Sequence, residues 1–259
     1  MARASLPPPD KMGFLDHLEE LRQRLVKSLI GLVVGFAACW GFHEQIFEFM
    51  TQPLRRAFPD VKFIFTAPTE AFMLYMKMSF FVGIFVAAPY LLYQAWAFVA
   101  PGLYAHEKRW AVPFVVLGTL FFVSGGLFGH YVLFPVTFRF LGGFAGPGMQ
   151  FMPRIGEYYS FYSWFLLGLG LVFQLPVVIL VLSRIGLVTP GFLMRQFKYA
   201  VLGSFVVAAI ITPTPDMVTQ SLLAVPMIGL YLLGVFVAWL FGRPRRAPEA
   251  AQSGVSAAG

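Results

Sequence analysis

The sequence consists mainly of long apolar runs separated by short segments that hold most of the charges. A bilayer core about 30 Å thick requires roughly 20 apolar residues for one helical crossing, and most of the runs reach that length. The runs do not alternate apolar with polar residues, which argues against the strands of a membrane β-barrel. The pattern therefore predicts an all-α membrane protein with six transmembrane helices, at Leu25–Phe42, Ala71–Phe98, Ala111–Phe138, Tyr158–Leu182, Tyr199–Ile211 and Met217–Phe241.

Two amphipathic helices are expected beside the spans. Leucines recur at helical spacing from Leu15 to Leu25, while His17, Glu20 and Arg24 fall on the other face. This spacing predicts a surface helix that leads directly into the first span. The segment 43–69 has room for a second short amphipathic helix, which we expect Pro53 and Pro59 to break because proline lacks a backbone donor.

Prolines inside four of the runs predict bent helices. They are Pro89, Pro113, Pro135 and Pro176, and each removes a backbone hydrogen bond from its helix. Bends in several spans favour a concave bundle. The fifth run has about 13 residues, which at 1.5 Å per residue cover roughly 20 Å of the core, so we expect the bilayer to be thin beside it.

The ends of the chain differ in composition from the rest. Residues 1–11 are rich in proline, and residues 242–259 are rich in alanine and arginine, so we expect both tails to be disordered. Residues 12–241 are expected to form one transmembrane domain.

Composition and charge agree with a membrane location. Apolar residues make up 58% of the chain, charged residues 12%, and the mean hydropathy is +0.74, which implies lipid as part of the solvent. The net charge is +7, but the basic residues flank the apolar runs and do not form the basic stripe that would indicate nucleic-acid binding. Of the 19 basic residues, 13 lie on the side of the two termini and 5 on the other. The positive-inside rule therefore predicts that both termini are cytoplasmic.

No motif for catalysis or for a cofactor is present. The chain lacks HExxH, GxSxG, a P-loop, GxGxxG and any cluster of His and Cys, so we expect no enzyme, no cofactor and no metal site. The single Cys39 excludes an internal disulfide. Gly31-x-x-x-Gly35 and Gly125-x-x-x-Gly129 favour close helix packing within the monomer over a dimer contact.

Three polar residues at or near membrane depth are candidates for a functional face. Lys77 and Gln174 are expected to lie on the concave face, although Lys77 could extend to the headgroups and Gln174 could bond to the broken helix backbone. Asp216 lies in a Thr-Pro-Thr-Pro-Asp turn, where it could simply cap the sixth span.

Acidic residues on the predicted cytoplasmic face stand out because that face is otherwise basic. Glu19 and Glu20 precede the first span, and Glu107 lies between the second and third. Taken alone, Glu20 with Arg24 is an ordinary ion pair at i, i+4 spacing.

Several segments, in order along the chain, resemble the TatC family, the receptor of the twin-arginine protein translocase. The most diagnostic resemblance covers Ala88–Arg109, which contains the Glu107 loop. Other matching segments are Phe14–Leu25, Gln52-Pro53-Leu54 in the outside loop, Phe134-Pro135, the turn Thr212–Asp216 and Ala224–Met227.

The resemblance implies a multi-pass inner-membrane receptor for folded proteins whose signal peptides carry two consecutive arginines. It places Glu20 and Glu107 at the arginines and Phe98 and Leu103 beside them, with Glu19 and Arg22 in the same cytoplasmic patch. A planar guanidinium bonds a carboxylate through two parallel N–H groups, so paired glutamates would favour arginine over lysine. Gln174 departs from the family, in which this position is often Glu.

The resemblance also implies partners and an energy source. The partners are TatA- and TatB-type single-span proteins and further copies of the receptor, and export would depend on the proton-motive force. The alternative function is a secondary transporter or channel for a small solute. Such proteins commonly contain internal repeats with paired broken helices, and no clear repeat relates the two halves of this chain.

Overall fold

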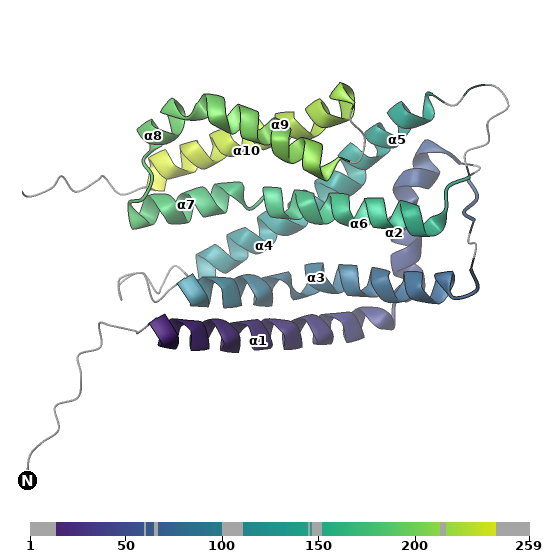
Figure 1. The fold of residues 1–259 in the computed structure, drawn as a ribbon, viewed down its shortest axis with the longest axis horizontal. Helices are drawn as coiled ribbons and strands as arrows, with labels where there is room; N and C mark the ends of the chain where they lie inside the picture. Colours follow the sequence, from purple (N-terminus) through teal and green to yellow (C-terminus); the bar gives the residue numbers. More distant parts are fainter. Residues whose placement is uncertain are drawn as a thin grey trace, which may run out of the picture. The chain divides into compact units, whose positions relative to one another are not determined.

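The computed structural model describes residues 14–59, 61–64, 67–99, 111–144, 146, 152–212 and 216–241. These residues form helices, together with one isolated bridge between Ile64 and Arg154. The chain divides into two compact units, Met1–Leu171 and Val172–Gly259, each of which is described by itself. The prediction of an all-α protein is confirmed for the described residues (Figure 1).

Most of the helices belong to the first unit. In chain order they are α1 (Phe14–Trp40), α2 (His43–Ala57), α3 (Glu70–Val99), α4 (Ala111–Phe128), the π-helix η3 (Gly129–Leu133), α5 (Phe134–Gly142) and α6 (Ile155–Val172). The second unit contains α7 (Leu175–Ile185), α8 (Pro190–Arg195), α9 (Phe197–Ile211) and α10 (Met217–Phe241).

Among the described residues, five helical segments are long and apolar enough to cross a membrane. They are His17–Trp40, Glu70–Phe98, Val112–Gly142, Ile155–Ile185 and Met217–Phe241. The remaining predicted span, the fifth in chain order, corresponds to α9, an apolar helix of 15 residues. At 1.5 Å per residue α9 covers about 22 Å, so the prediction of a short fifth span is confirmed.

Helices α1 and α3 lie side by side over much of their length (Figure 1). Their backbones approach closely at Gly35 and Gly83, where a Cβ added to Gly35 would lie 2.7 Å from the Gly83 carbonyl oxygen. The glycine motif in α1 therefore serves packing within the monomer, as predicted. The opposite face of α1 is apolar and exposed, with Leu25 67% accessible, as expected for a surface that meets lipid.

The prediction that Pro53 breaks the helix in the segment 43–69 is wrong. Helix α2 continues through Pro53 to Ala57 and ends two residues before Pro59. Pro53 and Leu54 are both buried, and the Tyr158 hydroxyl donates to the carbonyl of Met50 at 2.6 Å. Tertiary packing in the first unit thus outweighs the one backbone hydrogen bond that proline removes.

The prolines of the third and fourth spans act differently from one another. Pro113 is the third residue of α4, where a missing N–H costs nothing, so the expected bend at this position does not arise from it. Pro135 follows η3, a stretch of π-helix that interrupts the ordinary ladder. Pro176 lies in the first turn of α7, directly after α6 ends at Val172.

In the second unit, α7, α8 and α9 pack against α10. Gly234 of α10 lies against Ile179 of α7, and the Tyr231 hydroxyl donates to the carbonyl of Leu193 at 2.8 Å. The Gln220 side chain donates to the carbonyl of Phe205 at 2.9 Å. The last of these contacts holds the short α9 beside the longer α10.

Candidate functional site

The polar face of α1 meets α3 near the start of the first helix. Arg24 donates from Nη2 to Oε1 of Glu20 at 3.3 Å, and from Nη1 to Oε1 of Gln94 at 3.2 Å. Gln94 is only 4% exposed, so the amide that holds Arg24 is a fixed point on α3. The predicted pair of Glu20 and Arg24 at i, i+4 spacing is therefore confirmed. Because Arg24 also bonds Gln94, the pair belongs to a hydrogen-bonded connection between α1 and α3.

The second carboxylate oxygen of Glu20 can still accept a hydrogen bond at this corner. Oε2 is buried and has no hydrogen-bond partner among the described residues, while Oε1 is held by Arg24. The Glu20 side chain is 19% exposed and that of Arg24 is 27% exposed. A carboxylate that is partly screened from water and only half satisfied suits a second donor, above all a cationic one.

An aromatic contact lies at the same corner. The ring of Phe98 stacks on the imidazole of His17, with centroids 4.5 Å apart and planes inclined by 18°. On α3, Phe98 lies one helical turn after Gln94. On α1, Glu20 lies three residues after His17. The structure thus brings Phe98 and Glu20, two of the predicted site residues, to one end of the contact between α1 and α3.

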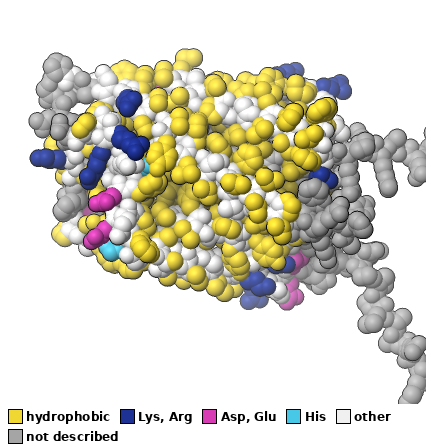
Figure 2. Space-filling view, turned by 180° about the vertical axis from the view of Figure 1, so that it is seen from behind, with side chains coloured by type: hydrophobic (Ala, Val, Ile, Leu, Met, Phe, Trp, Pro, Cys, Tyr) yellow, Lys and Arg dark blue, Asp and Glu magenta, His cyan; other side chains and the backbone are white. Residues whose placement is uncertain are grey.

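Four other residues are predicted for the cytoplasmic patch. Glu19 and Arg22 are exposed on α1. Glu107 and Leu103 lie outside the described residues. On the face drawn in Figure 2, hydrophobic side chains dominate and the charged ones lie towards the margins. We therefore expect charge-based recognition at the ends of the helices rather than along their sides.

The polar residues predicted at membrane depth occupy different environments. Lys77 is exposed on α3, and its carbonyl accepts a hydrogen bond from the Tyr159 hydroxyl. Gln174 is partly buried directly before α7, in the interruption that precedes Pro176. Asp216 caps α10, since its Oδ1 accepts from the backbone N–H of Thr219 at 2.6 Å. The capping interpretation of Asp216 is confirmed.

Gln94 is the residue of this site to which sequence reasoning gave no role. A signal was present, because Gln94 and Phe98 are four residues apart and so share one face of α3. Its partner Arg24 is 70 residues away, and nothing in local periodicity pairs the two. Within the described part of the chain, no group of three or more His, Cys, Asp or Glu side chains is suited to a metal ion.

Comparison with protein families gives one match over most of the chain. A family profile described as "Sec-independent protein translocase protein (TatC)" matches residues 16–226. Curated relatives with the same name are similar over nearly their whole length. That of Koribacter versatilis is 42% identical over 263 residues, covering 98% of this chain and 96% of the relative, and that of Desulforapulum autotrophicum is 44% identical over 241 residues, covering 93% and 89%.

Comparison with solved structures gives the same result. The chain is similar to the structure described as "Crystal Structure of Twin Arginine Translocase Receptor- TatC", with a TM-score of 0.75 and 35% sequence identity. The match covers 88% of this chain and all of the solved one. A second crystal structure of that receptor, described as in DDM, matches with a TM-score of 0.76.

Proposed function

Because the chain belongs to the TatC family of Sec-independent protein translocase proteins, we propose that Glu20 and Glu107 together bind the paired arginines of signal peptides. The protein is a multi-pass component of the inner membrane and of the twin-arginine translocase. This function replaces the alternative of a small-solute transporter. The peptide-binding role rests on one observation above all, the partly satisfied carboxylate of Glu20 beside Phe98.

The contacts of Glu20 suggest how an incoming arginine is accepted. A guanidinium binds a carboxylate best through two parallel N–H groups, which requires both carboxylate oxygens. Oε2 has no partner among the described residues, and Oε1 becomes free when its bond with Nη2 of Arg24 breaks. Arg24 keeps its bond from Nη1 to Gln94, so it loses one hydrogen bond and not both.

Two acidic residues match two consecutive arginines. Under the proposal, Glu20 receives one guanidinium and Glu107 the other, and Phe98 and Leu103 supply apolar contact beside them. Lysine carries the same charge but presents a compact ammonium that cannot form the parallel pair of bonds. The proposed site therefore favours twin arginine over twin lysine by geometry.

The remaining features of the proposal concern the assembly. The 13 basic residues on the side of the termini favour a cytoplasmic location for this site. We further propose TatA- and TatB-type single-span proteins and other copies of this chain as partners. Export of the folded cargo would be driven by the proton-motive force, in keeping with the lack of a nucleotide-binding motif in the sequence.

Peptide binding to the purified protein in lipid nanodiscs tests the site. Each charge-assisted pair contributes about 1.5–3 kcal/mol, so Glu20→Gln and Glu107→Gln should each weaken binding of a twin-arginine peptide by roughly tenfold to a hundredfold. Glu48→Gln, which removes an exposed carboxylate on α2 and away from this corner, is the matched control and should change binding little. High salt should weaken wild-type binding towards the level of the variants.

A twin-lysine peptide provides the second arm. It should bind the wild-type protein weakly and should lose little further affinity in Glu20→Gln. Wild-type affinity for the twin-arginine peptide in folded Glu20→Gln and Glu107→Gln proteins would disprove the assignment of these two residues.

A further inference from the structure

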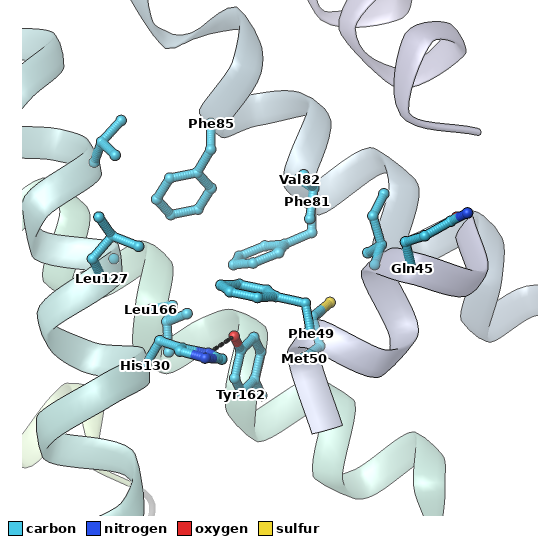
Figure 3. Close-up of a pocket in the computed structure, with 13 residues that line it drawn as sticks. Gln45, Phe49, Met50, Phe81, Val82, Phe85, Leu127, His130, Tyr162 and Leu166 are labelled. Atoms are coloured by element: carbon cyan, nitrogen blue, oxygen red, sulfur yellow. Dashed lines mark hydrogen bonds between the residues drawn. The ribbon is translucent and has the colours of Figure 1, made fainter. Parts of the chain in front are cut away.

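A cavity of about 360 Å³ lies within the first unit, between α2, α3, the α4–η3 region and α6 (Figure 3). Its wall is almost entirely hydrocarbon, contributed by Phe49 and Met50 of α2, Phe81 and Phe85 of α3, and Leu127 and Leu166. Phe49 and Leu127 are themselves exposed, so the cavity opens on the surface of the helices and not into a closed core. It lies among membrane-spanning helices, where the surrounding medium is lipid.

Two buried polar side chains, His130 and Tyr162, interrupt this apolar lining. His130 of η3 is 1% exposed, and its Nδ1 lies 2.7 Å from the hydroxyl of the equally buried Tyr162. The ring of Phe49 stacks on the imidazole, with centroids 4.1 Å apart and planes inclined by 4°. Nε2 of His130 is buried and has no hydrogen-bond partner among the described residues.

The hydrogen on this imidazole follows from a count of unpaired groups. If Nδ1–H donated to the Tyr162 oxygen, both the hydroxyl hydrogen and the Nε2 lone pair would lack a partner among the described residues. If the hydroxyl donates to Nδ1, only one group lacks a partner, so this arrangement costs less. A neutral imidazole carries one N–H, which therefore lies on Nε2. His130, which lines the cavity, therefore has one N–H donor with no partner among the described residues. It belongs to a π-helical segment, and such segments are frequent at functional sites.

A cation lies on the polar side of this histidine. Tyr131 packs edge-on against His130, with centroids 4.5 Å apart, and the guanidinium carbon of Arg56 lies 5.6 Å from the centroid of Tyr131. Arg56 and its neighbour Arg55 are exposed in the last turn of α2. Contacts therefore connect the apolar wall to His130, His130 to Tyr131, and Tyr131 to the guanidinium of Arg56.

We propose that this cavity binds one acyl chain of an anionic glycerophospholipid. The chain fills the apolar space, its ester carbonyl accepts the hydrogen bond from Nε2 of His130, and its phosphate pairs with Arg56. A glycerophospholipid presents these three groups in the same order along its length. It is also the most abundant molecule around the protein, so mass action favours its binding even at modest affinity.

Other occupants match these observations less well. A polar solute would leave its own hydrogen-bonding groups facing hydrocarbon, at high cost. A lipoquinone carries carbonyl groups but has no anion to pair with Arg56. The inference does not depend on the proposed function, because none of the residues that carry it belongs to the corner at Glu20.

Photolabelling tests the proposal in the full-length protein. The protein is reconstituted in vesicles of phosphatidylethanolamine and phosphatidylglycerol with a small fraction of phosphatidylglycerol that carries a diazirine on one acyl chain. After irradiation, mass spectrometry of peptides should find Phe49, Phe85 or Leu127 labelled at least fivefold above Val116 and Leu120. The last two residues are exposed on α4 and report ordinary contact with bulk lipid.

A substitution that fills the cavity supplies the control for location. A Cβ added to Gly126 would lie 2.5 Å from the Phe85 ring, so Gly126→Leu should bring cavity labelling down to the level at Val116. Gly203→Leu is the matched variant, because a Cβ at Gly203 meets nothing within 4 Å. It should leave labelling of the cavity unchanged.

Competition between unlabelled lipids tests the chemistry without altering the fold. Ester-linked phosphatidylglycerol should reduce labelling several-fold more effectively than its ether-linked analogue, and more effectively than phosphatidylcholine. Arg56→Gln should abolish only the preference over phosphatidylcholine. The proposal would be overturned if the cavity were labelled no more strongly than Val116. It would also be overturned by equal competition from ester and ether lipids, or if a lipoquinone displaced the labelled lipid at a far lower concentration.

Discussion

Arg24 donates a hydrogen bond to the side chain of Gln94 at 3.2 Å, although 70 residues separate the two in the sequence. The same guanidinium holds Glu20, one turn earlier on α1, at 3.3 Å. Gln94 therefore influences how strongly Arg24 binds the carboxylate of Glu20. The proposed arginine site is thus a property of two helices, and the following predictions begin with this link.

Replacement of Gln94 should weaken peptide binding without touching any predicted contact of the peptide. In Gln94→Leu, Arg24 keeps only Glu20 as a partner among the described residues, so an incoming arginine displaces it at greater cost. One hydrogen bond contributes about 0.5–1.5 kcal/mol, which predicts roughly twofold to tenfold weaker binding. Titration of the peptide measures this effect, with the exposed Gln23→Leu as control. Unchanged affinity in Gln94→Leu would remove Gln94 from the site.

Loss of the Phe98 ring should also weaken binding. Aromatic pairs contribute about 0.5–1.5 kcal/mol beyond the area they bury, and Phe98→Ala removes the stack on His17 that defines this corner. We expect several-fold lower affinity for the twin-arginine peptide. Phe80→Ala, which truncates an exposed ring elsewhere on α3, should bind normally. Equal effects of the two variants would point to a general change in α3.

The hydroxyl of Tyr158 should stabilise the packing of α2. Its bond to the carbonyl of Met50 joins α6 to α2 across 108 residues. Hydrogen bonds between membrane helices contribute about 0.6 kcal/mol on average and up to about 1.7 kcal/mol. Tyr158→Phe should therefore lower the free energy of unfolding by this amount in detergent. Tyr199→Phe, at a position 59% exposed, should leave it unchanged.

The topology prediction is tested by labelling intact cells with a membrane-impermeant maleimide. In a Cys39→Ser background, single cysteines at Ala4, Ala105 and Ser253 should stay unlabelled from outside. A cysteine at Thr69, which is exposed directly before α3, should react. Reaction at Ala105 together with protection at Thr69 would invert the predicted orientation.

The short α9 predicts a locally thin bilayer. Because α9 covers about 22 Å of a core about 30 Å thick, the turn that follows it should lie near the membrane surface. A fluorescent probe at Val218→Cys should be quenched best by lipids with shallow quenchers. A probe at Val206→Cys, in the middle of α9, should be quenched best by deep ones. The same depth for both probes would contradict local thinning.

The sequence by itself determined which segments cross the membrane and several local details. Length and apolarity predict the spans because every backbone group within lipid must be bonded inside its own helix. The cap at Asp216, the pair of Glu20 with Arg24 and the short α9 depend on neighbours within a few residues, and all three are present in the structure. The two tails and the Glu107 loop stay predictions.

Only the tertiary structure decided which faces of the helices meet. Lipid is as apolar as a protein core, so an apolar stripe does not distinguish the inside of a bundle from its outside. On α1, Gly31 and Gly35 pack against α3, while Leu18, Leu21, Leu25 and Leu29 are exposed. The persistence of α2 through Pro53, the partner of Gln94 and the cavity at His130 all depend on contacts between distant segments. Local periodicity carries no information about those contacts.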